Sequence, residues 1–392
     1  MDLLHLRAAL GRRSVMLRPT VTDMVAVERP NVPMHCLRPD AIVAAAAEFV
    51  EGFPGEVLYA VKCNPDPAVL HAVWEGGVRH FDCASLREVE LVRGLFPDAA
   101  IHFMHPVKSR SAIRVAWAAG VRDFSLDHPD ELAKIRTEVG ETQDFGLFVR
   151  LALPRGRAVY DLSGKFGASV EDAAALLRAA RPHAARLGLC FHVGSQCLDP
   201  RAWHDAIALA GAALTLAGVA VDVIDVGGGF PVSYPDSEPP PLSAFFTAIQ
   251  TGLDELDLPV TPRLWAEPGR ALVAGGVSVV VQVLLRRDDA LYITDGVYGS
   301  LSDAGAPGFR FPARLLRPDG SSPAAIMCDY TLFGPTCDSA DRMAGPFRLP
   351  ADVREGDWIE IGQLGAYGAC LRTGFNGFDV VHTVEVRDPP ML

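Results

Sequence analysis

Lys62 follows an apolar run at residues 58–61, and the turn-forming pair Asn64-Pro65 comes just after it. This pattern predicts a buried strand at residues 57–61 with the lysine at its carboxyl end. In α/β barrels, the loops at the carboxyl ends of the strands carry the chemistry. A lysine held there can lose its proton by desolvation and act as an amine nucleophile. A lysine that reaches solvent from a strand end would explain the run equally well.

Other polar residues and glycines also follow apolar runs. They are Asp82 in HFDCAS, His192 in LCFHVGS, Gly227, Gly228 and Gly229 after VDVIDV, and Glu267 and Arg270 after RLWA. Each feature alone is weak evidence, because a triple glycine is often only a tight turn and a lone histidine is often structural. Since the carboxyl ends of barrel strands meet at one mouth, the set together indicates one site.

The residue types in this set have complementary chemistry. Glycine-rich backbone after a strand can bind a phosphate through its N–H groups. A carboxylate can keep a ring nitrogen protonated, a histidine can stack on a flat ring, and a lysine amine can react with an aldehyde. A phosphate, a pyridine nitrogen and an aldehyde together describe pyridoxal 5′-phosphate.

The elements that must position these residues alternate between short apolar runs and alanine-rich helical windows. Eight strands are expected, in EVLYAVK, HFDCAS, IHFMHP, DFSLD, FGLFVRLA, GLCFHV, VDVIDVGGG and RLWAEPG. Eight βα units predict an α/β fold with a (β/α)8 TIM barrel at residues 38–273, and a doubly wound open sheet is the alternative. Residues 274–392 read as strands without long helices and, with residues 1–37, predict an all-β, sandwich- or barrel-like domain. PMHCL is expected as an edge strand of that domain.

Bulk composition limits the classes of partner. The net charge of -12 argues against nucleic-acid and anionic-membrane binding. The eight cysteines form no C-x-x-C pair, which favours reduced thiols over disulfides or a metal site. Residues 1–13 carry no signal-peptide pattern and no segment reaches membrane-spanning length, so a cytoplasmic protein is expected.

Several segments, in order, carry a specific resemblance. YAVKCN, FDCAS, FHVGSQ, DVGGGFP, EPGR, GPTCDSAD and GAYG with FNGF resemble the alanine-racemase-type (fold type III) pyridoxal-phosphate-dependent decarboxylases of basic amino acids, and among them most closely the ornithine decarboxylases. The resemblance runs over essentially the whole chain. It implies decarboxylation of L-ornithine to putrescine and carbon dioxide in polyamine biosynthesis. It also implies a homodimer in which each active site is shared across the interface.

The resemblance also implies roles for the barrel residues. Lys62 would bond the cofactor aldehyde and then transfer protons, His192 would stack on the cofactor face, and Glu267 would bond the pyridine nitrogen. The remaining cofactor-binding residues would be Asp82, Arg150, Ser195, Gly227, Gly228, Gly229, Gly269, Arg270 and Tyr367.

The β-domain would complete the site. By the same resemblance, Cys337 would reprotonate Cα after carbon dioxide leaves, Asp338 would accept the distal ammonium of the substrate, and Phe375 would line the pocket. The segment after DGVYGS departs from the ornithine enzymes, and there Asp303 is the candidate for a second substrate carboxylate.

Three alternatives stay open. The substrate could be lysine as well as ornithine, because the sequence gives no measure of pocket length. A racemase could use the same scaffold, although the Cys337-Asp338 pair favours decarboxylation. A non-catalytic homologue that binds a regulatory protein is disfavoured because the cofactor residues are all present.

Overall fold

The structure, a computed structural model, describes residues 18–156 and 158–391. Residues 1–13, on which the expectation about a signal peptide rests, lie outside this part of the chain. The chain divides into two compact units. Of the described residues, the barrel unit comprises those within 43–232 and 238–272, and the β unit comprises 18–42, 233–237 and 273–391.

The barrel unit is built on a closed barrel of parallel strands. The strands, in barrel order, are β10 (Val223–Asp225), β11 (Arg263–Ala266), β2 (Glu56–Ala60), β3 (His80–Cys83), β4 (Ala100–Phe103), β5 (Asp123–Leu126), β6 (Gly146–Arg150) and β8 (Arg186–Cys190). These are the eight strands expected from the sequence, so the TIM-barrel prediction is confirmed and the open sheet is wrong.

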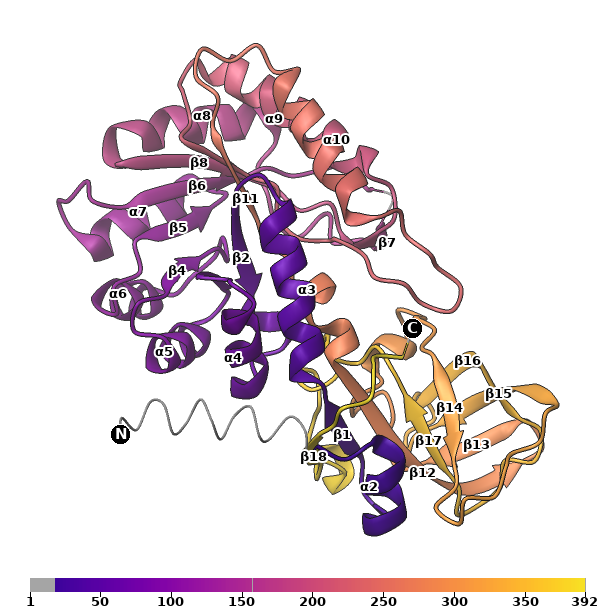
Figure 1. The fold of residues 1–392 in the computed structure, drawn as a ribbon. Helices are drawn as coiled ribbons and strands as arrows, with labels where there is room; N and C mark the ends of the chain where they lie inside the picture. Colours follow the sequence, from indigo (N-terminus) through magenta and orange to yellow (C-terminus); the bar gives the residue numbers. More distant parts are fainter. Residues whose placement is uncertain (1–17, 157, 392) are drawn as a thin grey trace, which may run out of the picture. The chain divides into compact units, whose positions relative to one another are not determined.

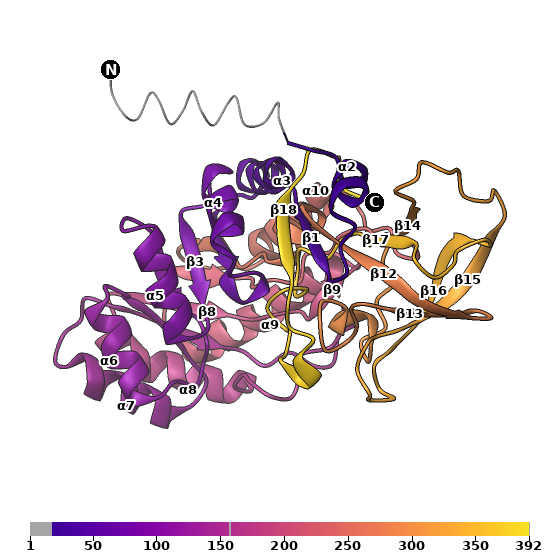
Figure 2. The same ribbon diagram turned by 90° about the horizontal axis from the view of Figure 1, so that it is seen from below.

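Helices follow the strands and surround them (Figures 1 and 2). They are α3 (Pro39–Gly52), α4 (Pro67–Glu75), α5 (Leu86–Leu95), α6 (Arg110–Ala118), α7 (Pro129–Val139), α8 (Val170–Ala180), α9 (Arg201–Ala217), α10 (Leu242–Asp254) and the short α11 (Arg270–Val273). Serine caps start several of them. Ser85 Oγ accepts from the Glu88 amide and Ser109 Oγ from the Ala112 amide, which satisfies backbone groups that the first turn leaves unpaired.

An apolar layer fills the middle of the barrel. Leu58, Phe148 and Trp265 belong to one buried cluster, and the rings of Phe148 and Trp265 stack with their centroids 4.8 Å apart. Gly188 makes room for this stack, because a Cβ there would lie 2.3 Å from Phe148. Side chains alternate along each strand, so this layer separates one interior layer towards the strand starts from another towards the strand ends.

The β unit contains a mixed eight-stranded sheet. Its strands are β1 (Met34–Leu37), β12 (Val277–Arg287), β13 (Ala290–Ile293), β14 (Ala313–Leu316), β15 (Met327–Phe333), β16 (Arg342–Pro350), β17 (Trp358–Ile361) and β18 (His382–Glu385). The all-β prediction is confirmed. Two details differ, since β16 was not expected and β1 is no edge strand but pairs with both β12 and β18.

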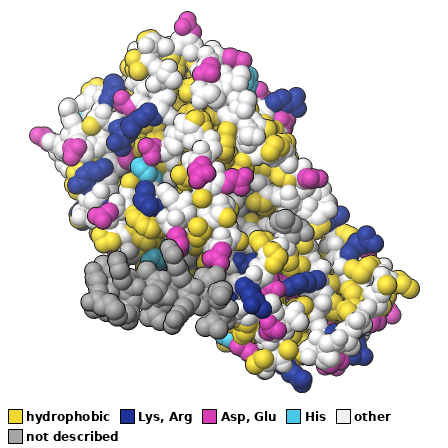
Figure 3. Space-filling view, in the orientation of Figure 1, with side chains coloured by type: hydrophobic (Ala, Val, Ile, Leu, Met, Phe, Trp, Pro, Cys, Tyr) yellow, Lys and Arg dark blue, Asp and Glu magenta, His cyan; other side chains and the backbone are white. Residues whose placement is uncertain are grey.

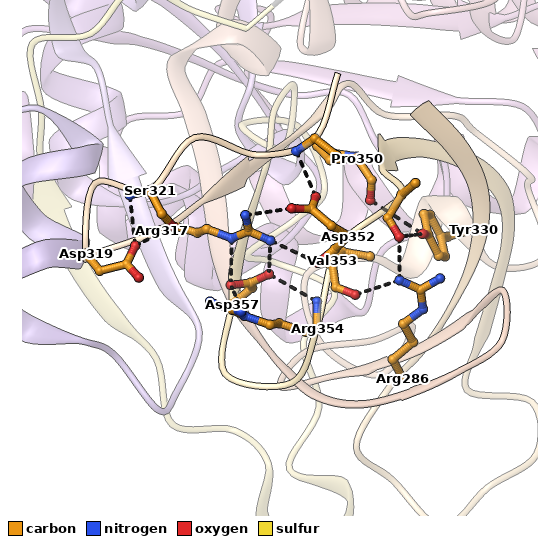
Figure 4. A network of polar contacts seen from close by, with 12 residues as sticks. Arg286, Arg317, Asp319, Ser321, Tyr330, Pro350, Asp352, Val353, Arg354 and Asp357 are labelled. Atoms are coloured by element: carbon orange, nitrogen blue, oxygen red, sulfur yellow. Dashed lines mark hydrogen bonds and ion pairs between the residues drawn. The ribbon is translucent and has the colours of Figure 1, made fainter. Parts of the chain in front are cut away.

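A polar network holds the loops at one end of this sheet (Figure 4). Arg317 forms ion pairs with Asp352 at 2.9 Å and with Asp357 at 3.1 Å. Its guanidinium donates hydrogen bonds to both carboxylates, and these raise the pKa of Arg317 although burial opposes the rise. Arg286 donates to the carbonyls of Ala351 and Val353 at 2.7 and 2.8 Å. The network thereby ties the ends of β12, β14 and β16 together.

On the face of the molecule shown in Figure 3, side chains of both charge signs are interspersed. The described residues include no helix with the length and hydropathy needed to span a bilayer.

Candidate active site

Lys62 lies at the mouth of the barrel, as predicted, but not on the strand. Strand β2 ends at Ala60, and a single 3-10 turn, Val61–Cys63, carries the lysine. Its ammonium forms an ion pair with Asp82 of β3, with 2.8 Å between Nζ and Oδ2. The Asp82 side chain is buried and that of Lys62 is 41% exposed. Partial exposure and a carboxylate neighbour both favour the charged form of the Lys62 amine. The structure therefore does not show the desolvated amine that the sequence led us to expect.

Glu267 and Asp225 bring two buried carboxyl groups together in the mouth. Glu267 follows β11 and is 4% exposed, and Asp225 ends β10 and is fully buried. Burial and then the charge of Asp225 raise the pKa of Glu267 well above its usual value. Burial likewise raises the pKa of Asp225, which is hydrogen-bonded to Glu267. Burial therefore disfavours a full negative charge on both carboxyl groups.

These two carboxyl groups also have unused acceptors. Asp225 Oδ1 accepts from the Gly227 amide at 2.9 Å. No amide, ammonium or hydroxyl donor among the described residues reaches Asp225 Oδ2 or Glu267 Oε1. Since buried polar atoms are normally hydrogen-bonded, this lack marks a place for a donor from a bound group.

The triple glycine forms a strained turn after β10. Gly227 and Gly229 have φ angles of +67° and +104°, which favour glycine. A Cβ at Gly227 would lie 2.1 Å from the Phe191 carbonyl oxygen, and one at Gly229 would lie 2.3 Å from that of Gly194. These positions therefore have room for backbone but not for a side chain, and they lie beside the loop that carries His192.

His192 lies next to this turn and is neutral. Its Nδ1 accepts from the Gly194 amide at 3.0 Å, so the ring proton sits on Nε2. Desolvation, followed by the charges of Arg150 and Lys62, lowers the pKa of His192 well below its usual value. Burial raises the pKa values of Asp225 and Glu267, and the charge of Arg150 offsets part of that rise. Arg150 therefore belongs to the mouth and is not the surface arginine that a strand end could have placed.

The remaining barrel residues predicted for the site lie beside these. Arg270 Nη2 donates to Ser195 Oγ at 3.4 Å. Gly269 packs against the turn that carries Lys62, because a Cβ there would lie 2.9 Å from Cys63 Cβ. A cavity of about 310 Å³ opens next to His192. Its lining includes Arg150, Phe166, Gly194, Asp161 and Asp205.

A second group of predicted residues gathers within the β unit around Tyr298. The Tyr298 hydroxyl donates to Asp338, and its ring lies 4.9 Å from that of Phe375. The Cys337 amide donates to Asn376 Oδ1 at 3.2 Å, and the Cys337 side chain is exposed. Three loops, those of GVYGS, GPTCDSAD and FNGF, are thus tied together.

The last two predicted residues also lie in the β unit. Asp303 is in a 3-10 turn, Ser302–Ala304, and its carbonyl accepts from the Phe309 amide at 2.9 Å. Tyr367 follows β17 and has a φ angle of +60°.

Sequence reasoning missed two residues of these groups, Asp225 and Tyr298. Asp225 is the last residue of β10, two residues before Gly227, so alternation along the strand was a signal that could have found it. Tyr298 lies in the quoted DGVYGS segment, but its contact with Asp338 spans 40 residues and no local pattern indicates it.

The residues present fit pyridoxal phosphate. The buried Glu267 Oε1 lacks a donor, which a protonated pyridine nitrogen would supply. At Gly228 and Gly229 no side chain stands between the backbone and a phosphate, whereas the Gly227 amide already donates to Asp225. Among the described residues there is no group of three or more histidine, cysteine, aspartate or glutamate side chains arranged to hold a metal ion.

Comparison with protein families supports this fit. Residues 40–274 match the family described as "Pyridoxal-dependent decarboxylase, pyridoxal binding domain". The chain is 34% identical to a lysine/ornithine decarboxylase of Selenomonas ruminantium, over 85% of this chain and 84% of that protein. It is also 34% identical to an ornithine decarboxylase of Schizosaccharomyces pombe, over 82% of this chain and 75% of that protein.

Solved structures resemble the whole chain. The arginine decarboxylase of Paramecium bursaria Chlorella virus bound to agmatine has a TM-score of 0.82 at 28% identity, covering 93% of this chain and 99% of that one. The lysine/ornithine decarboxylase of Vibrio vulnificus complexed with putrescine has a TM-score of 0.79 at 30% identity, covering 95% and 98%.

Proposed function

The chain belongs to the fold type III pyridoxal-phosphate-dependent decarboxylases of basic amino acids, and we propose that it converts L-ornithine to putrescine and carbon dioxide. The observation that carries the proposal is the barrel mouth. There Lys62 is paired with Asp82, and Glu267 has a buried oxygen without an amide, ammonium or hydroxyl donor among the described residues. A nucleophilic amine and an acceptor for a ring nitrogen are the two protein groups that this cofactor needs.

Pyridoxal phosphate, when bound, supplies an aldehyde that takes up an amine and a ring that accepts the electrons left when a carboxylate departs. Lys62 would supply the amine that holds the cofactor. Asp82 orients Lys62 towards the mouth and pairs with its positive charge. Glu267, which is hydrogen-bonded to Asp225, would hold a proton at the pyridine nitrogen.

The other end of the cofactor would be anchored by backbone and cations. The Gly228 and Gly229 amides would bind phosphate oxygens, since the Gly227 amide already donates to Asp225 Oδ1. Gly269, Arg270 and Ser195 would complete the phosphate site, and the Arg270 guanidinium already reaches Ser195 Oγ. By the resemblance to the family, Tyr367 would also bind the phosphate. The neutral His192 ring would lie against the bound cofactor, with Arg150 beside it.

The β-unit loops would bind the far end of the substrate. Asp338 accepts the distal ammonium and is held in place by the Tyr298 hydroxyl. Asp303 offers a second carboxylate, and Phe375 keeps the departing carboxylate in a dry environment. Cys337 delivers the proton to Cα.

We also propose a homodimer in which these loops serve the barrel mouth of a second copy. The exposure of Cys337 and Phe375 supports it, because a thiol that protonates a carbanion needs to be shielded from water. The partner surface supplies that shielding.

A second candidate is dual activity on lysine and ornithine. The 34% identity to a lysine/ornithine decarboxylase supports it, as does the reshaped segment around Asp303. Two carboxylates select a substrate with a distal ammonium over one with a neutral group. They can bind the ammonium of either ornithine or lysine if the loop around Asp303 can move.

The test measures carbon dioxide release from L-ornithine, L-lysine, L-arginine and diaminopimelate side by side, with protein saturated with pyridoxal phosphate. We expect the highest kcat/KM with ornithine, whereas comparable values for lysine would favour dual activity. The absorption band of the lysine-bound cofactor, bleached by borohydride, reports binding independently. A band without turnover of any of the four amino acids would refute the decarboxylase, and no band would refute cofactor binding by Lys62.

The role of Cys337 has its own test. Cys337→Ala should slow turnover by about 10²-fold or more, since a positioned acid typically contributes that much. It should also place some protons on the cofactor carbon instead of Cα, which is visible as an aldehyde by-product. Cys328→Ala, at another exposed cysteine, is the matched control and should leave both readouts unchanged. Unaltered product partitioning in Cys337→Ala would contradict the assignment.

A further inference from the structure

An ion pair within the β unit lies at the base of the loops that carry Tyr298 and Phe375. Arg372 belongs to the segment between β17 and β18, and its side chain is 9% exposed. It pairs with Asp295, which follows β13 by two residues and is 2% exposed, with 3.1 Å between Nη1 and Oδ2. The pair therefore joins the start of the GVYGS loop to the start of the FNGF loop.

The Arg372 guanidinium holds these loops at further points. Its Nη1 also donates to Ser300 Oγ at 2.8 Å, and its Nη2 donates to the Phe378 carbonyl at 3.3 Å. The Ser300 hydroxyl lies 2.8 Å from His35 Nε2 of β1, and the Ser300 amide donates to Asp295 Oδ1 at 3.2 Å. Burial, followed by the charge of Arg372, lowers the pKa of His35 to about 4, so this ring is neutral. Both ends of the GVYGS loop are thus tied to one arginine.

The loop closes tightly around the carboxylate of Asp295. Burial raises the pKa of Asp295, and the charge of Arg372 and hydrogen bonds to the carboxylate offset part of that rise. A Cβ at Gly299 would lie 1.7 Å from Asp295 Oδ1 and 3.1 Å from Arg372 Nη1. Because removing one partner of a buried pair leaves the other charge uncompensated, the path of this loop depends on Arg372.

A second buried carboxylate, Asp341, ties the GVYGS loop to the GPTCDSAD loop. Asp341 Oδ1 accepts from the Val297 amide at 2.8 Å. Its Oδ2 accepts from the amide and the hydroxyl of Thr336, at 3.1 and 2.7 Å. Tyr298, the neighbour of Val297, is therefore held between the two anchored loops.

Tyr298 connects the arginine to the residues proposed to meet the substrate. The amide of Thr373, next to Arg372, donates to the Tyr298 carbonyl at 2.9 Å. At its other end the Tyr298 hydroxyl donates to Asp338, and its ring lies 4.9 Å from that of Phe375. A displacement of Arg372 therefore moves the tyrosine that contacts both of these side chains.

We propose that Arg372 is a positioning residue for substrate recognition. Through Tyr298 it sets where Asp338 and Phe375 lie, and so how well the distal ammonium of a basic amino acid is bound. The inference rests on the proposed role of Asp338 in binding that ammonium. Since the donors of Arg372 described above go to protein groups, it acts through its neighbours and not on the substrate.

Decarboxylation of L-ornithine and of L-norvaline by the full-length protein loaded with pyridoxal phosphate tests this role. Norvaline has the carbon chain of ornithine without the distal amine, so it makes no use of Asp338. We expect Arg372→Gln to lower kcat/KM for ornithine on the order of 10²-fold, as a misplacement of about 1 Å can do. The much lower norvaline value should stay unchanged, so the ratio of the two falls. A general loss of structure would lower both values together and would contradict the proposal.

Arg317→Gln is the matched control. Arg317 is another arginine of the β unit, 5% exposed, and it pairs with Asp352 and Asp357 away from the three loops (Figure 4). Its loss should lower stability and leave the ratio of ornithine to norvaline at the parent value. An equal fall of the ratio in this variant would mean that the ratio reports destabilisation, and would overturn the role of Arg372.

Hydrogen–deuterium exchange of the same proteins needs no turnover. In Arg372→Gln we expect faster amide exchange in residues 295–300 and 372–378, and parent rates there in Arg317→Gln. Unchanged exchange would overturn the proposal. Faster exchange in a protein whose parent form does not decarboxylate ornithine would refute the proposed function and leave the anchoring of the loops by Arg372 in place.

Arg372→Lys covers the case in which Arg372→Gln does not fold. A lysine keeps a charge for Asp295, but its single nitrogen cannot also reach the Phe378 carbonyl. The ratio of ornithine to norvaline should therefore still fall and the exchange of residues 372–378 should still rise. A folded Arg372→Lys protein with the parent ratio and parent exchange would overturn the proposal.

Discussion

The two ends of the barrel interior bury ionisable side chains in different ways. At the mouth, Asp225 and Glu267 face each other, and each keeps an oxygen that no amide, ammonium or hydroxyl donor among the described residues reaches. At the opposite end, where the barrel strands begin, His102 and Asp123 have partners for every side-chain nitrogen and oxygen. Unpaired buried acceptors cost stability and are kept where a ligand satisfies them, whereas a paired network holds strands together. Partnering, rather than burial, therefore distinguishes the two ends.

Lys62→Gln should give the largest effect, and only on activity. The amide can still donate to Asp82, so the fold should be retained, but the nucleophilic amine is gone. We expect decarboxylation to fall on the order of 10²–10⁴-fold, together with loss of the borohydride-sensitive absorption band. Carbon dioxide release and absorption spectra measure both. A variant that keeps the band would mean that another lysine holds the cofactor.

Asp123→Asn should give the largest effect on stability, from the opposite end. Removing this charge leaves Arg186 and the His102 Nδ1 proton without a charged acceptor, and hydrogen bonds to charged groups are worth roughly 1.5–3 kcal/mol. Denaturant unfolding followed by tryptophan fluorescence measures the change. Activity per folded molecule should stay at the parent value, and a selective loss of turnover would contradict the functional distinction between the two ends.

Glu267→Gln should raise stability while lowering activity. In the cofactor-free protein the amide can donate to Asp225, which removes a conflict worth roughly 1–3 kcal/mol. The raised pKa of Glu267 means that the folded state keeps a proton that the unfolded state releases above about pH 4.3. Parent stability should therefore fall as pH rises from there, and the variant should lack this slope. If the parent and the variant showed the same dependence of stability on pH, the two carboxyl groups at the mouth would already be satisfied by other partners.

The smallest expected effect is the coupling between the two ends. In a cycle of Glu267→Gln and His102→Gln, the changes in free energy of unfolding should add within about 0.5 kcal/mol. The apolar layer of Leu58, Phe148 and Trp265 separates the two sites. A larger coupling would show that Trp265 transmits changes between them, since it lies on β11, contacts His102 and precedes Glu267 by two residues.

Local pattern was enough for the elements that are set by short-range periodicity. Apolar runs bounded by Gly and Pro located all eight barrel strands, and the quoted motifs located Lys62, Gly227 and Glu267 at their carboxyl ends. The local sequence pattern did not predict a strand whose formation depends on pairing with a distant strand. β16, with Gly345, Pro346 and alternating exposure, has no continuous apolar run, and it is a strand because β15 pairs with it.

The sequence by itself determined the barrel, the β domain and the residue types at the mouth, because alternation and turn residues act over a few positions. Only the tertiary structure decided which side chains became partners. Asp338 meets Tyr298 across 40 residues, and His80 meets His102 across 22. Strand pairing within each unit sets such distances, and the pKa shifts of Glu267 and His192 follow from the burial and the neighbours that folding imposes.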